Sequence, residues 1–415
     1  MTHACPRLRR AVVTATAVGV LVVPLAGGTA SAGPAARPGA VTVTAPPGMS
    51  PTGVRKLSPG VVRQLDQAVL RVMRQAGVPG VTVGLWTPDQ GEYVKSFGVA
   101  DKSTGRKMSP ELYMRIGSET KTFTVTALLH LVDRHKVRLD DPVGTYVAGV
   151  PNGNNITLRQ LAGMRSGLFD YTADAGFRKA LTSNPRQTFT PHQLLSYAFK
   201  HTARFPPGRK FDYSNTNLIL LGLVVEKAGG RPLADYIATH VLRPAGLDET
   251  FFPAGAQFPR PHAHGYTNQT ANGEVRDATG WNPSWAWAAG AMVSNLDDLR
   301  VWARTVATGV LPDGSRLISP ASQKQRLTAS PTSVPGAAYG LGIFDVRGWI
   351  GHNGSLPGYE SLTVYLPSAR TTLVVLLNSD IAEAGTEPST LLGQAITKIV
   401  TPGHVFDLPA RTAAR

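Results

Sequence analysis

Cysteine is almost absent from this sequence, because Cys5 is the only one among 415 residues. It precedes an apolar run, so it is not placed as a lipidation site, and it has no partner for a disulfide. The chain therefore does not depend on disulfide cross-links. We expect its stability to come from a large hydrophobic core, which a chain of this length can bury without covalent staples.

Acidic residues are also scarce, since 27 Asp and Glu stand against 42 Lys and Arg and leave a net charge of +15. A positive envelope steers a protein toward polyanions, and anionic cell-wall polymers are the partners we hypothesise for an exported protein. The basic residues are scattered without a zinc-finger, Walker or RNA-recognition signature, so we expect no nucleic-acid partner. A soluble surface of high isoelectric point explains the charge without any partner.

The first 32 residues are typical of a signal peptide. Three arginines precede an apolar run over residues 11–27, and Ala-Ser-Ala at 30–32 fits a cleavage site. The run is short and interrupted by Pro24, so we expect no stable membrane anchor. Residues 33–59, rich in Pro, Gly, Ala and Thr, predict a flexible tether. We therefore expect a secreted protein with a folded domain over 60–405 and a C-terminal tail over 406–415.

Ser-Glu-Thr-Lys at 118–121 is the most informative stretch that is present. Residues three apart on a helix share a face, so the Lys121 amine can reach the Ser118 hydroxyl. A serine nucleophile needs such a neighbouring base, and a helix N-terminus stabilises a developing oxyanion. Taken alone, the tetrapeptide also fits an ordinary helix start with a solvated lysine. A buried helix over 118–135 is indicated by apolar residues at helical intervals, Val125, Leu128, Leu129 and Val132.

A second stretch, residues 206–217, is a turn-rich approach that ends in Tyr213, Ser214 and Asn215 and leads into an apolar helix over 218–225. A phenol beside a lysine ammonium is shifted toward phenolate, because the positive charge favours the ionised form. It can then take a proton from serine.

A third stretch is Gly-His-Asn-Gly-Ser at 351–355, which precedes alternating apolar residues over 361–366 typical of a strand. Gly354 would let a substrate backbone lie close to this segment, because glycine has no side chain.

The set Ser-x-x-Lys, Tyr-x-Asn and His-x-Gly, in that order, resembles the serine β-lactamase and DD-peptidase family, most of all the class C enzymes and the secreted D-alanyl-D-alanine carboxypeptidases. The resemblance extends from about Leu57 to Asp380. Further family-like phrases occur in the family's order: Ile156 to Leu161, Ser166 to Leu168, Ala288 to Met292 and Tyr339 to Gly342.

The resemblance implies a role for each catalytic residue. Ser118 becomes the acylated nucleophile, and Lys121 either shares its proton or lowers the pKa of Tyr213. Tyr213 becomes the general base and then the acid that protonates the leaving amine. Asn215 is expected to hydrogen-bond Lys121 and the amide carbonyl of the substrate.

The resemblance also implies residues that bind substrate. His352 lines the opposite side of the site, and the backbone N–H groups of Ser118 and Ser355 form the oxyanion hole. Trp285 matches an aromatic that lines the cleft in DD-peptidases, although an ordinary core or rim tryptophan explains it as well.

Two departures from the family bear on the substrate. Asn353 stands where the family usually has Thr, whose hydroxyl helps to hold the substrate carboxylate, although its amide could still donate. An arginine that faces the same carboxylate is replaced by Ile-Phe-Asp at 343–345, and Arg347 need not point inward. An esterase or amidase with a neutral substrate is therefore an open alternative.

The expected elements begin with a helix over 61–76 and strands over 80–86 and 92–99. Helical runs between long loops follow over 140–327, then strands over 340–346, 361–366 and 372–378 and a helix over 391–400. This order predicts an α+β fold: an antiparallel sheet built from both chain ends and flanked by helices, with a mostly helical inserted subdomain. The β-lactamase/transpeptidase-like fold implied by the resemblance has the same architecture.

His262 and His264 are two residues apart and suggest a metal site. No further ligand cluster stands near them, and a closed zinc site needs three or four ligands, so we expect a structural role. We expect neither a metal nor an organic cofactor.

The sequence as a whole predicts a secreted serine hydrolase that forms an acyl-serine intermediate. We expect a D-alanyl-D-alanine carboxypeptidase acting on peptidoglycan stem peptides, with possible β-lactam binding at the same serine. A β-lactamase and an esterase or amidase that takes another small acyl substrate are rivals of the same family. A wall-binding protein that keeps the fold without catalysis is the non-enzyme alternative.

Overall fold

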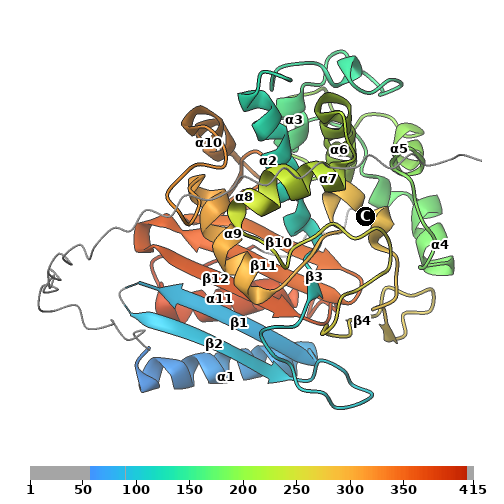
Figure 1. Ribbon diagram of the computed structural model, residues 1–415. Helices are drawn as coiled ribbons and strands as arrows, with labels where there is room; N and C mark the ends of the chain where they lie inside the picture. Colours follow the sequence, from blue (N-terminus) through green and yellow to red (C-terminus); the bar gives the residue numbers. More distant parts are fainter. Residues whose placement is uncertain (1–56, 89, 409–415) are drawn as a thin grey trace, which may run out of the picture. The chain divides into compact units, whose positions relative to one another are not determined.

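The computed structural model describes residues 57–88 and 90–408 (Figure 1). The predicted signal peptide and nearly all of the predicted tether lie outside these residues. Helix α1 (Pro59–Ala76) opens the fold: Ser58 accepts the backbone N–H of Val61, and Gly77 ends the helix in the left-handed conformation. Leu57 and Phe406 are both buried, so the folded body includes them. No helix within the described ranges is both long and apolar enough to span a membrane.

An eight-stranded antiparallel sheet joins two distant parts of the chain in the order β2-β1-β12-β11-β10-β9-β8-β7. Strands β1 (Gly80–Thr87) and β2 (Gly91–Gly98) precede the helical part, and β1 pairs directly with β12, so that Val83 faces Val375. The other strands follow the helical part: β7 (Ser330–Pro331), β8 (Ala337–Tyr339), β9 (Phe344–Val346), β10 (Trp349–Leu356), β11 (Tyr359–Leu366) and β12 (Thr371–Leu377).

Helices cover both faces of this sheet. α11 (Pro388–Val400) packs on β11 and β12 and against α1, and Leu362 of β11 lies against Gly393 of α11. α9 (Leu296–Thr308) covers the other face, where Tyr365 packs with Ala303 and Ala307. Residues 362 and 365 face opposite sides because side chains alternate along a strand.

The segment between β2 and β7 is mostly helical, which confirms the predicted α+β fold with an inserted helical part. Two short pairings interrupt it, β3 (Met114–Arg115) with β6 (Val293–Ser294) and β4 (Tyr266–Thr267) with β5 (Arg276–Asp277). Besides α9, its α-helices are α2 (Thr120–Asp133), α3 (Leu158–Ala162), α4 (Ala175–Ser183), α5 (Pro191–Phe199), α6 (Asn215–Gly229), α7 (Leu233–Ile237), α8 (Arg243–Ala245) and α10 (Pro320–Leu327).

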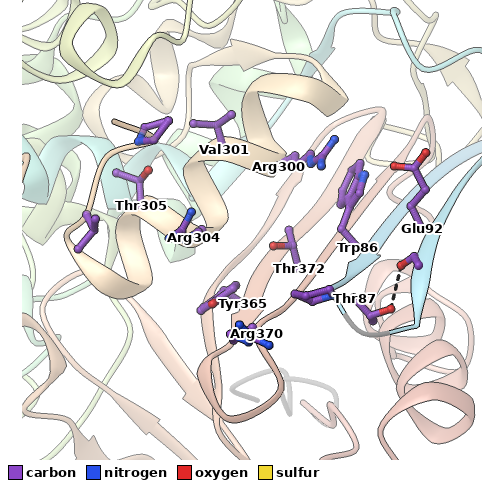
Figure 2. A pocket seen from close by; sticks show the side chains of 14 residues that line it. Trp86, Thr87, Glu92, Arg300, Val301, Arg304, Thr305, Tyr365, Arg370 and Thr372 are labelled. Atoms are coloured by element: carbon purple, nitrogen blue, oxygen red, sulfur yellow. Dashed lines mark hydrogen bonds between the residues drawn. The ribbon is translucent and has the colours of Figure 1, made fainter. Parts of the chain in front are cut away.

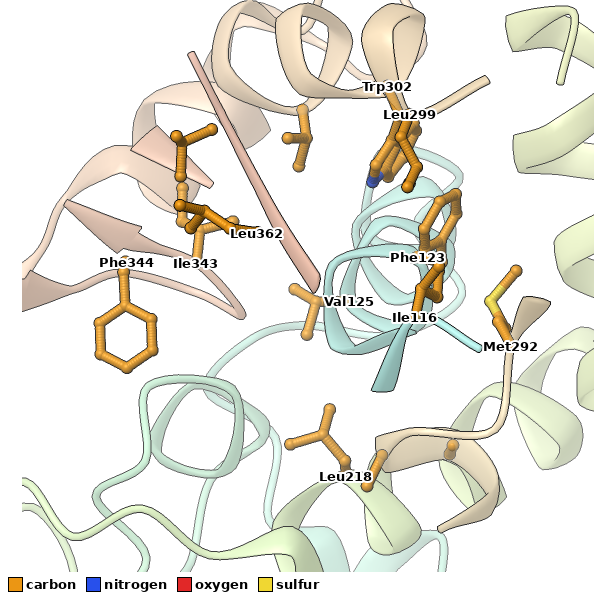
Figure 3. Packing of buried hydrophobic residues seen from close by; sticks show 14 of the residues in the cluster. Ile116, Phe123, Val125, Leu218, Met292, Leu299, Trp302, Ile343, Phe344 and Leu362 are labelled. Atoms are coloured by element: carbon orange, nitrogen blue, oxygen red, sulfur yellow. The ribbon is translucent and has the colours of Figure 1, made fainter. Parts of the chain in front are cut away.

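Helix α2 is buried on nearly all sides, whereas the sequence predicted one apolar stripe. Phe123 stacks on Trp302 with ring centroids 4.1 Å apart, and apolar residues from α6, α9 and the sheet surround the helix (Figure 3). The hydroxyls of Thr122, Thr124 and Thr126 donate to backbone carbonyls, so these polar residues are buried without losing their hydrogen bonds. The core therefore holds the first turn of α2 rigidly.

Candidate active site

Ser118 lies in a 3₁₀ turn, Gly117–Glu119, that leads directly into α2. Lys121 follows in the first turn of α2 and is 0% exposed. Its Nζ lies 2.9 Å from Ser118 Oγ, 2.9 Å from Asn215 Oδ1 and 2.7 Å from the Ala289 carbonyl oxygen. The structure thus brings three of the predicted site residues into one hydrogen-bonded group.

The surroundings of Lys121 fit proton exchange with Ser118. Asn215 Oδ1 and the Ala289 oxygen can only accept, which orients two N–H bonds of Lys121 toward them. The third position on Lys121 Nζ faces Ser118 Oγ. In the ammonium form Lys121 donates a hydrogen bond there, and in the neutral amine form it can accept the hydroxyl proton. Both roles that the sequence left open for Lys121 are compatible with this geometry.

Tyr213 and Asn215 stand at the N-terminus of α6, beside the N-terminus of α2. Lys121 Nζ lies 4.9 Å from the centroid of the Tyr213 ring, which also lies edge-on to Tyr339 at 6.2 Å. Two helix N-termini therefore meet at Ser118, and their partial positive charges favour negative charge that develops there.

Asp170 is a site residue that sequence reasoning missed. Asn215 Nδ2 donates to Asp170 Oδ2 at 3.1 Å, so a hydrogen-bonded chain runs from Ser118 through Lys121 and Asn215 to this carboxylate. Asp170 comes two residues after the family-like phrase that ends at Leu168, but it is 45 residues from Asn215 and no local pattern links the two.

Strand β10 meets the Ser118 turn through glycine backbone. A Cβ placed on Gly117 would lie 2.6 Å from the Ser355 backbone nitrogen, so only glycine allows this approach. The contact puts the Ser355 nitrogen beside the Ser118 turn, as an oxyanion hole made from both residues requires. The missing side chain of Gly354 makes room for the Ile116 carbonyl of the chain itself, where a Cβ would lie 2.0 Å away, and its predicted approach to a substrate backbone stays a prediction.

His352 lies at the edge of the same group, 2% exposed and enclosed by aromatic rings. Its ring centroid is 6.1 Å from that of Tyr213 and 4.9 Å from that of Phe344, and its Nε2 lies 3.2 Å from the Tyr339 hydroxyl. His352 is therefore near Tyr213, at the edge of the group around Ser118.

The structure does not bring Asn353 to this group. Side chains alternate along β10, so Asn353 faces away from His352 and toward α11, where its Nδ2 donates to Glu387 Oε2 at 2.7 Å. Arg347 occupies an exposed turn between β9 and β10, with its side chain near Gly336. Asn353 therefore does not lie where the resemblance placed a contact to a substrate carboxylate, and Arg347, which the sequence did not require to point inward, is exposed.

Trp285 lies in a 3₁₀ turn, Pro283–Trp285, and is half-buried. Its ring packs 6.0 Å from that of Phe177, and its carbonyl accepts the Tyr171 hydroxyl at 2.6 Å. These contacts favour the reading of Trp285 as a core or rim residue.

Glu119, next to the nucleophile, is 1% exposed. Burial raises the pKa of its carboxyl to about 8, although the hydroxyls of Ser361 and Thr363 oppose that shift. Near neutral pH Glu119 is therefore mostly protonated, so it adds little negative charge beside Ser118.

His262 and His264 have other partners. His264 Nδ1 lies 2.7 Å from Asp277 Oδ2, and His262 Nδ1 lies 2.6 Å from the Pro259 carbonyl oxygen. Over residues 57–88 and 90–408, no group of three or more His, Cys, Asp and Glu side chains is arranged to hold a metal.

Sequence comparison relates this chain to serine hydrolases. A sequence model of the Beta-lactamase family matches residues 65–395. A Bacillus subtilis protein named as penicillin-binding protein PbpX is 27% identical over 308 residues, which cover 74% of this chain and 70% of that protein. A D-aminopeptidase of Brucella anthropi is 30% identical over 300 residues, 69% of this chain. This chain spans about half of the D-aminopeptidase, 54% of its length.

Solved structures show the same fold. A D-stereospecific amidohydrolase from a Streptomyces species has a TM-score of 0.73 and 29% identity, covering 82% of this chain and 98% of that chain. A D-amino acid amidase from Ochrobactrum anthropi, complexed with L-phenylalanine, has a TM-score of 0.70 and 25% identity. The match covers 81% of this chain and 98% of that chain.

Proposed function

The chain belongs to the β-lactamase family, and from this membership and the geometry around Ser118 we propose that it is a D-stereospecific amide hydrolase. Its substrate would carry a free amino group on the D-residue whose carbonyl is attacked. The observation that carries the proposal is the hydrogen-bonded chain from Ser118 to the Asp170 carboxylate.

The proposed reaction is acyl transfer through Ser118. Its Oγ attacks the amide carbonyl while the hydroxyl proton moves to Tyr213 or Lys121, and the backbone N–H groups of Ser118 and Ser355 receive the oxyanion. The C–N bond breaks when the leaving nitrogen takes that proton. Water then attacks the acyl-serine ester, releasing the D-amino acid and restoring the Ser118 hydroxyl.

The charges near Ser118 support an ammonium-bearing substrate more than a carboxylate-bearing one. Asp170 is held beside Asn215, the residue expected to contact the substrate amide, and a carboxylate there can pair with an α-ammonium. Asn353, which stands where the family holds a carboxylate, bonds Glu387 instead, and Arg347, the arginine nearest in sequence to the missing one, lies in an exposed turn. The D-aminopeptidase and D-amino acid amidase relatives agree with this choice.

The test compares the purified chain with Ser118→Ala on D-phenylalanine amide, L-phenylalanine amide and a peptide ending in D-Ala-D-Ala. We expect the D-amide to be hydrolysed at least about 100-fold faster than the L-amide. We also expect Ser118→Ala to lose hydrolysis of the D-amide, because Ser118 forms the acyl-enzyme intermediate. Unchanged hydrolysis in Ser118→Ala would contradict the mechanism. Hydrolysis of the D-Ala-D-Ala peptide alone would contradict the substrate class.

D-alanyl-D-alanine carboxypeptidase activity on peptidoglycan stem peptides is the second candidate, supported by the order of the three motifs and by the likeness to PbpX. Intact mass after addition of benzylpenicillin separates it from the remaining rivals. A long-lived adduct that needs Ser118 would indicate a penicillin-sensitive DD-peptidase. An adduct that forms and clears with turnover would indicate a β-lactamase, and no adduct would favour the amide hydrolase.

We also propose that the protein is secreted, on the strength of the signal-peptide pattern over residues 1–32. Mass spectrometry of protein from the culture medium tests this, with cleavage after Ala32 expected. The wall-binding alternative is tested by adding Ser118→Ala to isolated cell wall. Retained binding without hydrolysis would show a binding function that is separate from catalysis.

A further inference from the structure

The segment that carries Asp170 is tied to α6 by the hydroxyl of Thr216. Thr216 follows Asn215 in α6 and is 0% exposed. Its Oγ1 donates to the Phe169 carbonyl oxygen at 2.7 Å and accepts the Tyr171 backbone N–H at 3.1 Å. Phe169 and Tyr171 stand directly before and after Asp170, so one hydroxyl holds the backbone on both sides of this carboxylate residue.

The Asp170 carboxylate is itself held in one orientation. Its Oδ1 accepts the Thr172 backbone N–H at 3.2 Å, and its Oδ2 accepts Asn215 Nδ2 at 3.1 Å. Because hydrogen bonds prefer the plane of the accepting group, a bond at each oxygen fixes the plane of the carboxylate. The direction that the carboxylate faces therefore depends on where the backbone of residues 169–171 is held.

Two aromatic side chains keep the same segment attached independently of Thr216. Tyr171 is 0% exposed, and its hydroxyl donates to the Trp285 carbonyl oxygen at 2.6 Å. Phe169 stacks on His201 with ring centroids 3.8 Å apart. Loss of the Thr216 hydroxyl should therefore shift the carboxylate without releasing the segment.

From these contacts we propose that Thr216 is a positioning residue that makes the site selective for substrates with a free amino group. It holds the Asp170 carboxylate where an α-ammonium can pair with it, and this role rests on the proposed amide hydrolase function. A charge-assisted pair depends on distance and direction, whereas an N-acylated substrate has no charge to place there. Because Asn215 and Thr216 are consecutive in α6, one helix start sets both the acceptor for Lys121 and the place of this carboxylate.

Steady-state kinetics on D-phenylalanine amide and N-acetyl-D-phenylalanine amide tests the proposal. Thr216→Val removes the hydroxyl but keeps a branched side chain, and it should lower kcat/KM for D-phenylalanine amide by about 10-fold or more. The loss should lie mainly in KM, because the ammonium pairs with the carboxylate in the ground state as well as in the transition state. For the N-acetyl amide, kcat/KM should fall less than about threefold. Thr216→Ser, which keeps the hydroxyl, should restore the wild-type preference.

Thr397→Val is the matched control. Thr397 is also 0% exposed, and its hydroxyl donates to the Gly393 carbonyl oxygen at 2.7 Å and accepts the Phe406 backbone N–H at 2.9 Å, but it belongs to α11. Thr87→Val is a second control, because the Thr87 hydroxyl donates to the Gly91 carbonyl oxygen at 2.8 Å beside a cavity of about 740 Å³ at the end of β1 (Figure 2). Both controls should leave the ratio of kcat/KM between the two substrates unchanged, whatever stability they lose.

A double-mutant cycle shows whether Thr216 acts through Asp170. In the Asp170→Asn background, Thr216→Val should lower kcat/KM for D-phenylalanine amide by less than about threefold further, because residues that act through one contact are not additive. Full additivity of the two losses would overturn the proposal. Equal losses on both substrates in Thr216→Val, or an unchanged preference there, would overturn it too.

Asp170→Asn separates a failure of the proposed function from a failure of the positioning role. If it leaves the preference for a free amino group unchanged, the proposed substrate class fails together with the role of Thr216. If it abolishes the preference while Thr216→Val keeps it, only the positioning role fails. Thr216→Ala removes the same hydroxyl and replaces Thr216→Val if that variant does not fold. Failure of both to fold would show that the hydroxyl serves folding, and would also overturn the proposal.

Discussion

Gly117 lies against the backbone of Ser355, so that a Cβ at position 117 would sit 2.6 Å from the Ser355 nitrogen and 2.9 Å from the Gly354 carbonyl carbon. The two residues belong to a 3₁₀ turn before α2 and to β10, and they are more than two hundred positions apart. The oxyanion hole that we infer from Ser118 and Ser355 depends on this contact.

Gly117→Ala should therefore lower kcat by about 100-fold or more, which is the usual effect of losing one oxyanion donor. The added methyl group would push β10 away from the Ser118 turn. Gly105→Ala is the control, because Gly105 has φ +72° against +53° for Gly117 but nothing lies within 4 Å of its Cβ position. Similar losses of kcat in both variants would attribute the effect to backbone strain.

Asp170→Asn should reduce kcat/KM for D-phenylalanine amide by about 10- to 100-fold, because a hydrogen bond to a charged group contributes roughly 1.5–3 kcal/mol. Hydrolysis of the N-acetylated amide, which has no ammonium, should change less than threefold. Asp212→Asn is the control: Asp212 is next to Tyr213 but pairs with Arg204 at 3.2 Å. Equal losses on both substrates in Asp170→Asn would mean that Asp170 only supports Asn215.

Asn215 and Asn353 should respond differently to truncation. Asn215→Ala removes an acceptor of Lys121 and should lower kcat/KM by at least about 100-fold, within the range for disrupted proton transfer. Asn353→Ala loses a bond to Glu387 on the far face of β10 and should leave kcat/KM within threefold of the wild type. Steady-state kinetics on one amide substrate measures both. A large loss in Asn353→Ala would show that its side chain reaches the substrate.

Glu119→Gln should change how stability depends on pH. The folded pKa of about 8 lies above the ordinary value of 4.5, so between these pH values the folded state keeps a proton that the unfolded state loses. The stability that Glu119 contributes is thus fully present below pH 4.5 and is lost as pH rises through 8. The free energy of unfolding falls by roughly 5 kcal/mol at most as a result.

Chemical denaturation of wild type and Glu119→Gln at pH 5 and pH 8.5 measures the effect, and the variant should gain stability relative to the wild type at the higher pH. Glu111→Gln is the control, because the Ser109 hydroxyl lowers the pKa of the Glu111 carboxyl. A constant difference between Glu119→Gln and wild type would show that the Glu119 carboxyl is ionised in the folded protein.

Local periodicity predicted much of the fold and the centre of the site. Spacing of three at a helix start predicted the contact between Lys121 and Ser118, which is present although Ser118 lies in the 3₁₀ turn before α2. The all-round burial of α2 was not predicted, since its threonines look polar until their hydroxyls meet backbone carbonyls. Asp170 was missed because its contact with Asn215 is tertiary.

The misplacement of Asn353 has a physical reason that the sequence contained. Strand β10 already begins at Trp349, and alternation along it places residues 352 and 353 on opposite faces. Family resemblance assigned both residues to substrate binding, whereas the alternation of side chains along the strand places only one of them on the face of Ser118. The role of Gly354 could not be found locally, because the Ile116 carbonyl that it accommodates comes from a distant segment.

The pairing of β1 with β12 has a consequence for how the protein is made. Val83 and Val375 are about 290 positions apart, so β1 can pair with β2 at once but must wait for β12, which is made much later. Ser118 leaves the ribosome early, whereas Ser355 emerges late. A growing chain, or one truncated before β10, would therefore contain the nucleophile without its oxyanion partner, and acylation would begin only after Ser355 has been made and β10 has reached the Ser118 turn.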